Sequence, residues 1–354
     1  MNYKQEFNDL VQILLKEGGS DIHLGEGRKP IIRVNGNLIP LANKEEYSND
    51  DVYGILDVIL STENKKRLLE RRQVDFAYSH TNQERFRANA YFQQGKIGIA
   101  LRNIPEKIKT LEELSLPPIL EIFTEKKQGF FLLVGPVGQG KSTTMATLIE
   151  MINQKRTEHI ITIEDPIEYV FKESKSIIDQ REIRSDAHDF HSALINVFRQ
   201  DVNVVMVGEM RGIDTIATAV TAAETGHFIL STLHTNSAAQ TIQRVIDAFP
   251  SSQQNQIRLQ LASSLSGIFS QRLIPKVSGG LIPAYELLIN NVAVANVIRE
   301  NRVHEIETII ETGSNEGMIS LNRSLVDLVR SGTISDENAY KYSNNVKALE
   351  RLLN

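Results

Sequence analysis

Residues 135–142 read Gly-Pro-Val-Gly-Gln-Gly-Lys-Ser, which is the pattern Gly-x-x-x-x-Gly-Lys-Ser of a phosphate-binding loop. The apolar run 130–134 before it is typical of a buried strand, and residues 143–153 after it carry apolar side chains at helical spacing. A strand, a glycine-rich loop and a helix are the context that such a loop needs, because backbone N–H groups and the helix start surround the phosphate. The stretch therefore predicts a nucleotide-binding core rather than a structural glycine turn.

Two side chains of this loop have roles in the pattern. We expect Lys141 to reach the β- and γ-phosphates of a nucleoside triphosphate and Ser142 to supply an oxygen to Mg²⁺. The loop's predicted nucleotide-binding residues are Gly135, Pro136, Val137, Gly138, Gln139, Gly140, Lys141 and Ser142.

The composition is that of a globular chain with room for two domains. Of its 354 residues, 41 % are hydrophobic and 23 % are charged. A net charge of -5 without a long basic block disfavours nucleic acid as the main ligand.

The absence of cysteine excludes disulfides and thiolate metal sites and fits a reducing compartment. Because the sequence shows neither an 18-residue apolar run nor a secretory signal, we expect a cytoplasmic protein without a transmembrane segment.

Residues 1–103 have the pattern of a small α+β domain. Apolar spacing predicts helices near 7–15 and 52–60, and Asn35-Gly36-Asn37 predicts a hairpin turn. The segment 85–92 alternates apolar side chains with polar ones, which predicts a strand with one cation-bearing face. A linker is expected over 104–118.

Residues 119–354 are expected to form an α/β domain with a mainly parallel sheet, because apolar runs alternate with helical stretches. The expected strands include residues 130–134, 160–163, 204–207 and 228–233. Beyond about residue 251 we expect mostly helix. This expectation rests on the helical spacing of Ile257, Leu261, Leu265 and Ile268.

Three polar groups follow strands of the expected sheet, at the edge where ligands of open α/β sheets bind. Glu164 ends one strand and is a candidate to touch Mg²⁺ or its waters. Glu209 follows a strand similar to a Walker B strand, whose aspartate position is Gly208, and is a candidate to orient the attacking water. His234 ends a third strand and is a candidate sensor of the γ-phosphate. Each residue also has a structural alternative. Glu164 could be part of an acidic turn that ends the strand, Glu209 could be a surface acid, and His234 could be a structural histidine without a catalytic role.

Triphosphate hydrolysis also needs positive charge opposite the phosphate loop. Arg85, Arg87 and Arg102 lie on expected polar strand faces of the first domain, and they are candidates to reach a nucleotide in their own or a neighbouring subunit. The alternative is a solvated strand face.

With these segments in order, nearly the whole chain resembles the secretion ATPase superfamily, and closely the type IV pilus retraction (PilT-type) ATPases. The matching segments are residues 20–24, 85–89, 135–144, 163–169 (the acidic box), 208–211 (the Walker B box), 231–239 and 245–250. The resemblance implies a PAS-like N-terminal domain joined flexibly to a RecA-like core. It also implies a cytoplasmic homohexamer, bound at the inner face of the membrane, that hydrolyses ATP to act on a platform protein at the pilus base.

The same resemblance assigns roles by motif match. It implies that phosphate and Mg²⁺ are held by Lys141, Ser142 and Thr143, with help from Glu164 for the metal. Glu209 is implied as the general base and His234 as the phosphate sensor. The implied arginine partners are Arg85, Arg87 and Arg102. Domain closure driven by the nucleotide would then power pilus retraction and twitching motility.

The departures of the chain from the family pattern include Gln139 (commonly Ser), Val202 (Pro), Asn203 (Asp), Gly212 (Asp) and Ala295 (Arg). Ala295 lies in the segment that couples hydrolysis to retraction in the family, so an auxiliary or weakly hydrolysing role stays open. A pilus-extension or type II secretion ATPase is disfavoured because those usually carry a four-cysteine zinc element. A DNA-translocating ATPase is disfavoured by the acidic balance.

Overall fold

The computed structural model describes residues 1–34, 36–80, 84–104, 107–210 and 212–353. Asn35 of the expected hairpin turn, residues 105 and 106 of the expected linker and Arg211 of the Walker B box lie outside the described residues. The chain divides into two compact units. Unit 1 comprises Met1–Lys107 with Pro166–Val170, and unit 2 comprises Ile108–Asp165 with Phe171–Asn354. Within the described ranges, none of the helices has the length and apolar character needed to span a membrane.

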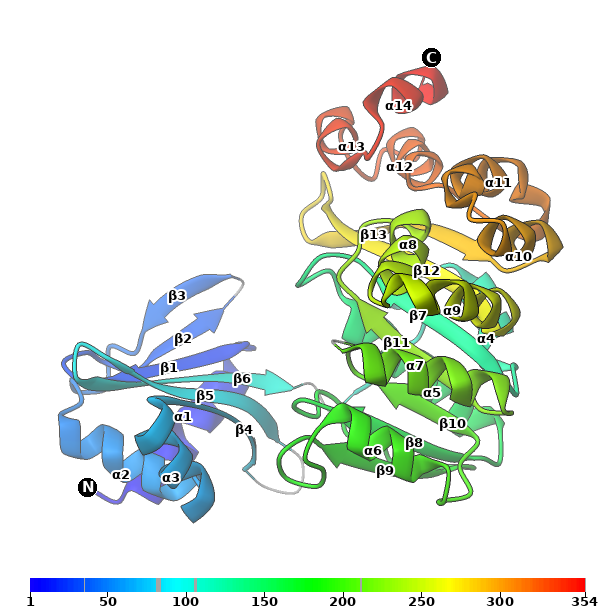
Figure 1. Ribbon diagram of the computed structural model, residues 1–354. Coiled ribbons are helices and arrows are strands. Elements are labelled where there is room, and N and C mark those ends of the chain that lie inside the picture. Colours follow the sequence, from blue (N-terminus) through cyan, green and yellow to red (C-terminus); the bar gives the residue numbers. More distant parts are fainter. Residues whose placement is uncertain (35, 81–83, 105–106, 211, 354) are drawn as a thin grey trace. The chain divides into compact units, whose positions relative to one another are not determined.

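Unit 1 is an antiparallel sheet in the order β3-β2-β1-β6-β5-β4, with helices packed on it (Figure 1). Its elements are α1 (Tyr3–Lys16), β1 (Asp21–Gly25), β2 (Ile31–Val34), β3 (Asn37–Pro40), α2 (Asn49–Ile59), α3 (Thr62–Arg71), β4 (Gln73–Ser79), β5 (Arg85–Gln93) and β6 (Lys96–Ile104). Alternation along the strands separates two faces. Ile22 and Phe86 are fully buried with Phe7 of α1, whereas Arg87 on the other face is exposed.

Unit 2 contains a sheet in the order β13-β12-β7-β11-β10-β8-β9, parallel except for the pair β12–β13. Its elements as far as the sheet extends are η1 (Pro118–Leu120), α4 (Glu121–Thr124), β7 (Gly129–Val134), α5 (Lys141–Lys155), β8 (His159–Glu164), β9 (Ile177–Glu182), α6 (Phe190–Val197), β10 (Val204–Val207), α7 (Ile213–Glu224), β11 (Phe228–Leu233), α8 (Ala238–Asp247), α9 (Ser251–Ser264), β12 (Leu265–Pro275) and β13 (Leu281–Ile289). The helical C-terminal part comprises α10 (Val292–Arg299), η2 (Val303–Glu305), α11 (Ile306–Thr312), η3 (Ser314–Glu316), α12 (Leu321–Arg330), α13 (Asp336–Tyr342) and α14 (Val346–Leu353).

The expectation of mostly helix beyond residue 251 is wrong for residues 265–289. Helix α9 ends at Ser264, and both Leu265 and Ile268 lie in strand β12, which is followed by β13. Ile268 and Phe269 are adjacent in sequence and both fully buried, because β12 lies between β7 and β13 and is covered on both of its faces. A strand buried in this way shows no alternation, so its apolar residues also fit a helical spacing.

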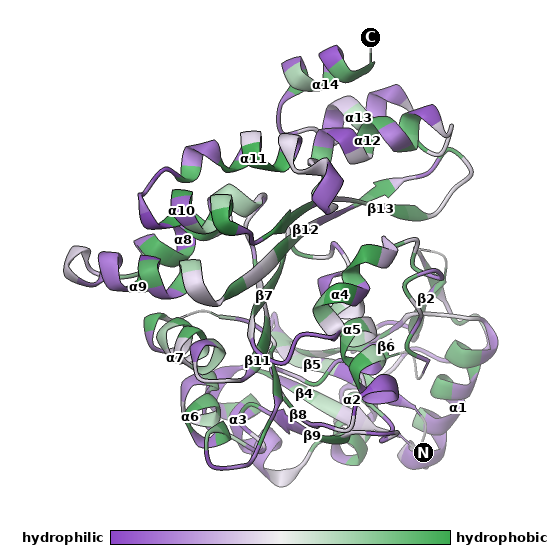
Figure 2. Cartoon of the chain, turned by 90° about the vertical axis from the view of Figure 1, so that its right-hand side faces the viewer, coloured by the Kyte–Doolittle hydropathy of each residue, from purple (hydrophilic) through white to green (hydrophobic). Residues whose placement is uncertain are grey.

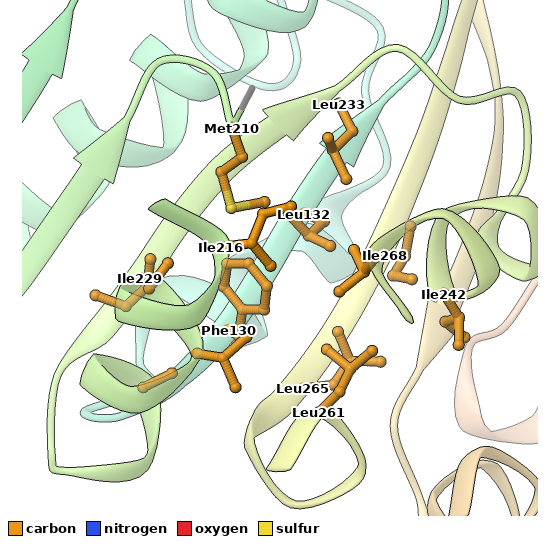
Figure 3. Close-up of a cluster of buried hydrophobic side chains, with 14 of the residues drawn as sticks. Phe130, Leu132, Met210, Ile216, Ile229, Leu233, Ile242, Leu261, Leu265 and Ile268 are labelled. Carbon is orange, nitrogen blue, oxygen red and sulfur yellow. The ribbon is translucent and has the colours of Figure 1, made fainter. Parts of the chain in front are cut away.

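The core of unit 2 joins the sheet to the helices that cover it. Figure 3 shows Phe130 of β7 and Ile229 of β11 among side chains from α7, α8 and α9 that include Ile216 and Ile242. Strands β7 and β11 are mainly green in the hydropathy colouring of Figure 2, whereas the helices alternate green with purple. The predicted fold class, an α/β core with a smaller α+β part, is therefore confirmed.

Candidate functional site

The carboxyl ends of four neighbouring strands bring the predicted core residues to one edge of the unit 2 sheet. In register, Val134 of β7 lies beside Leu233 of β11, and Val207 of β10 lies beside both Ser231 and Ile163. The groups that emerge at this edge are the loop 135–140 after β7, His234 after β11, Glu209 after β10 and Glu164 at the end of β8. Parallel pairing alone therefore gathers residues that are far apart in the sequence.

The phosphate loop has a backbone that only glycine adopts easily. Gly135, Gly138 and Gly140 have φ angles of 144°, 77° and 79°. A Cβ atom on Gly135 would lie 2.4 Å from the carbonyl oxygen of Gln271, so the loop lies directly against β12. Gly140 precedes α5 without a side-chain cap, and the start of a helix in this position favours a negatively charged ligand.

Lys141, His234 and Glu209 form a continuous chain of polar contacts. The ammonium of Lys141, 7 % exposed, donates to the carbonyl oxygens of Gly135 and Pro136 at 2.7 and 2.8 Å and lies 3.2 Å from His234 Nδ1. His234 Nε2 lies 3.4 Å from Glu209 Oε1. Because an ammonium only donates, the imidazole tautomer with its proton on Nε2 fits both contacts. The group predicted to bind phosphate is thus connected through a histidine to the predicted base.

Glu209 and His234 also border a cavity of about 410 Å³. Gln240 and Arg244 of α8 also line this cavity. A cavity of this volume has room for water molecules beside the carboxylate of Glu209.

The Glu164 carboxylate is buried and held by neighbouring side chains. Its Oε1 accepts hydrogen bonds from Thr162 Oγ1 at 2.7 Å and from Gln180 Nε2 at 3.3 Å. Asp165, the second acid of this turn, forms an ion pair with Arg184 at 3.2 Å. Glu164 therefore has a fixed position at the sheet edge, as a metal or water ligand needs.

The remaining predicted loop residues line the start of α5. Ser142 is exposed at the second position of the helix, and Thr143 is half-buried beside it. Val137 is 79 % exposed at the tip of the loop, whereas Gln139 is half-buried.

The three candidate arginines lie on one face of the unit 1 sheet, because Arg87 is directly opposite Arg102 and two residues from Arg85. Arg87 Nη1 contacts Glu168 of the segment Pro166–Val170 at 3.0 Å. Arg102 Nε contacts Asp21 Oδ1 at 3.0 Å, although its side chain is 70 % exposed. Arg85 is half-buried.

Asp21 is the buried carboxylate of this arginine face. Burial opposes its ionisation, but hydrogen bonds from Ser20 and Arg102 outweigh burial and hold the pKa of this carboxyl below its usual value. Arg33 lies 3.5 Å from the other carboxylate oxygen. A charged Asp21 therefore holds two guanidinium groups on the polar sheet face.

Sequence reasoning gave no role to three residues that support the site. Gln180 donates to Glu164 as described above. Gln271 of β12 contacts the phosphate loop, and Glu286 of β13 accepts from the N–H of Ala238 at 2.7 Å, at the start of the helix that follows the histidine loop. The sequence signal that would have found Gln271 and Glu286 is the strand pair β12–β13, which was predicted as helix.

Comparisons with known proteins agree with this architecture. The family model described as Type II/IV secretion system protein matches residues 4–280. The type IV pilus retraction ATPase PilT of Pseudomonas aeruginosa is 40 % identical over 339 residues, which covers 94 % of this chain and 97 % of that protein. The type IV pilus ATPase PilU of the same organism is 35 % identical, with 98 % of this chain and 91 % of that protein covered.

A solved structure extends the similarity to the fold. The crystal structure of the pilus retraction motor PilT with bound ADP matches with a TM-score of 0.91 and 42 % sequence identity, and covers 97 % of this chain and 98 % of that chain. The chain therefore belongs to the Type II/IV secretion system protein family, and within it to the PilT-type secretion ATPases, which makes it an ATP hydrolase.

Proposed function

We propose that this protein is a cytoplasmic homohexameric motor whose ATP hydrolysis powers type IV pilus retraction and twitching motility. The proposal rests chiefly on one observation, the Lys141–His234–Glu209 chain beside the phosphate loop, which links nucleotide binding to a candidate base. It is supported by the similarity to PilT and by a protein of Neisseria gonorrhoeae named Twitching motility protein, which is 39 % identical over 321 residues.

The phosphate loop binds ATP in this proposal. Backbone N–H groups of residues 137–143 surround the phosphates, and Lys141 exchanges its carbonyl partners for phosphate oxygens. The exchange is favourable because phosphate offers a full negative charge where the loop offers only carbonyl dipoles.

The side chains present fit Mg²⁺ as the metal that accompanies ATP. Ser142 and Glu164 offer hard oxygen donors at the same sheet edge. The described residues contain no group of three His, Cys, Asp or Glu side chains able to hold a metal without the nucleotide. Such a sparse set suits Mg²⁺, which binds through few protein ligands together with phosphate and water. When bound, Mg²⁺ neutralises charge on the β- and γ-phosphates.

Glu209 is the proposed base. Its carboxylate orients a water molecule and takes its proton as the terminal phosphoryl group is transferred. His234 holds Glu209 through Nε2 and faces Lys141 through Nδ1, so a shift of Lys141 toward phosphate changes the contacts of the histidine. This connection is how we propose that the site senses the γ-phosphate.

The arginines of unit 1 complete the site in this proposal. We propose an N-terminal domain of residues 1–103, a linker of 104–118 and an ATPase domain of 119–354. Arg85, Arg87 and Arg102 stabilise transition-state charge when the domains close in the same or a neighbouring subunit. The domains close and open because ATP and ADP favour different domain arrangements. This movement acts on a platform protein of the inner membrane at the pilus base.

Deletion of the gene in the source organism tests this function. We expect hyperpiliated cells that do not twitch, because pili would be assembled but not withdrawn. Expression of the wild-type protein should restore twitching, and expression of Glu209→Gln should not. Bald cells after deletion would contradict retraction and indicate an extension motor.

A second candidate is an auxiliary of the retraction machine that hydrolyses little. It is favoured by Ala295, which stands where the family commonly has arginine and is 7 % exposed within the core of unit 2. This candidate predicts that deletion leaves twitching measurable and that purified protein releases phosphate hardly faster than Glu209→Gln does.

A further inference from the structure

The side chain of Gln139 bonds outside the phosphate loop that carries it. Its Oε1 accepts a hydrogen bond of 2.7 Å from the backbone N–H of Leu273 in strand β12. A serine side chain at this position would end two bonds closer to the backbone. The contact to Leu273 is therefore specific to the longer side chain of this sequence.

A second glutamine makes the matching contact from the strand to the loop. Gln271 Nε2 donates to the backbone carbonyl of Gln139 at 2.8 Å, and Gln271 Oε1 accepts from Thr144 Oγ1 at 2.7 Å. Gln271 is only 3 % exposed. One buried side chain thus ties the end of the loop and the first turn of α5 to the same strand.

The sheet register explains why β12 is available for these contacts. The last residue pair between β12 and β7 is Ser270 with Val134, where β7 ends and the loop begins. β12 continues to Pro275, so its residues beyond Ser270 lie beside the loop instead of a strand. The closeness of the two segments is evident at Gly140, where a Cβ atom would lie 2.9 Å from Gln271 Nε2.

We infer that Gln139 is a positioning residue that fastens the phosphate loop to β12, together with Gln271, and thereby raises the affinity for the nucleotide. The inference rests on the proposed role of this loop in binding phosphate. A loop already held in its binding conformation loses less conformational entropy when the ligand arrives. The side-chain bond of Gln139 contributes about as much as one net hydrogen bond, which is roughly a five-fold difference in Kd.

The test replaces Gln139 by methionine, which has a similar length and lacks the amide oxygen. Gln271 is the less suitable target, because its loss leaves the hydroxyl of Thr144 and a loop carbonyl without their partner and endangers folding. Gln256→Met, the same substitution at an exposed position of α9, serves as the matched control.

Three measurements on the full chain define the expected result. In Gln139→Met, the Kd for ADP in the presence of Mg²⁺, measured by calorimetry, should rise about five-fold. Hydrogen exchange at the Leu273 amide should become faster. The KM for ATP should rise with kcat unchanged, since the loop acts on binding rather than on the chemical step. Gln256→Met should match the wild type in all three.

Two outcomes would overturn the inference. In the first, hydrogen exchange at the Leu273 amide becomes faster in Gln139→Met but the Kd for ADP does not change. The hydrogen bond then exists but does not raise the affinity for the nucleotide. An unchanged exchange rate means that Gln139 does not hold the strand in solution. Lys141→Ala separates these outcomes from a failure of the proposed site: undiminished ADP binding in that variant means that the loop is not the nucleotide site, and the inference then fails with it.

Discussion

The phosphate loop of unit 2 and the arginine face of unit 1 are prepared for a phosphate in different ways. The loop is shaped by glycines with positive φ angles and fixed by buried partners such as Gln271, and Lys141 beside it is 7 % exposed. On the arginine face, Arg102 is 70 % exposed and is held at Nε by Asp21, and Arg87 is paired with Glu168 at the surface.

Under the proposed function, this difference corresponds to a division of labour in which the loop binds nucleotide and the arginines act in catalysis. Buried, fully bonded groups hold a conformation at little further entropic cost, whereas surface ion pairs contribute about 0–1 kcal/mol and exchange partners easily. The loop is therefore suited to bind nucleotide in every state of the cycle. The arginines are suited to engage phosphate only in some states, which a closure cycle requires.

Removal of an arginine should have the largest effect, because the arginines are proposed to stabilise the transition state. We expect Arg102→Ala to lower kcat by about 10³-fold while the Kd for ADP changes little. Arg33→Ala is the matched control, since Arg33 contacts the same carboxylate on the same sheet face but is not among the candidates. Steady-state phosphate release and calorimetry measure the two quantities. A variant that loses ADP affinity at unchanged kcat would reverse the roles assigned to the two regions.

Removal of the Lys141 side chain should weaken nucleotide binding rather than slow the chemical step. Lys141→Ala is expected to weaken ADP binding by about 10²-fold, because a charged hydrogen-bond donor is lost from a water-poor site. Calorimetry with ADP and Mg²⁺ gives this number, and circular dichroism confirms that the variant is folded. Affinity equal to that of the wild type would remove the loop from the nucleotide site.

The two units also differ in a buried carboxylate. The pKa values of Asp21 in unit 1 and of Glu286 in unit 2 shift in opposite directions. The pKa of Asp21 lies below its ordinary value, as described above. Burial raises the pKa of Glu286 to about 7, opposed by the N–H of Ala238 and by Arg272 and reinforced by Glu307. The folded-state pKa of Glu286 is thus above its unfolded value of 4.5, so its contribution to stability is present below pH 4.5 and is lost as pH rises through 7.

We therefore expect Glu286→Gln to be more stable than the wild type at alkaline pH. The difference in the free energy of unfolding should grow by on the order of 2 kcal/mol between pH 5 and pH 8. The amide oxygen of glutamine still accepts from Ala238, so the cap of α8 is kept. Urea denaturation at both pH values measures the effect, and Glu311→Gln at an exposed position of α11 is the control. A difference that is equal at both pH values would mean that Glu286 stays charged throughout.

The smallest effect is expected for Asp21→Asn. A neutral amide still accepts from Arg102 but attracts its charge less, so the guanidinium is held less firmly. We expect kcat to fall a few-fold with unchanged affinity for ADP. Steady-state phosphate release measures kcat, and calorimetry measures the Kd for ADP. A fall in kcat as large as that of Arg102→Ala would show that Asp21 itself takes part in the reaction.

Contiguous motifs made much of the site predictable from the sequence. Gly135 to Ser142 form one uninterrupted pattern, and the acids after β8 and β10 follow short apolar runs that are typical of buried parallel strands. The edge at which they meet then follows from parallel pairing. Glu209 and His234 are 25 positions apart in the sequence, yet β10 and β11 are neighbours in the sheet.

The supporting contacts were not predictable because they depend on partners remote in sequence. Gln139 and Leu273 are separated by 134 positions, and Arg102 and Asp21 by 81. Strand β12 was also hidden, because a strand buried on both faces shows no alternation and follows a true helix without a break. The hydrogen bond of the Gln139 side chain to Leu273 can be recognised only once β12 is in place.

The central proposal is that Lys141, His234 and Glu209 form the site of ATP hydrolysis and that this hydrolysis powers a motor. Steady-state phosphate release from purified wild-type protein and from Glu209→Gln tests it most directly. The account predicts that the wild type turns over at least about 10²-fold faster than the variant, since the variant loses its base, while both bind ADP with the same Kd. A wild type no faster than Glu209→Gln would contradict the account.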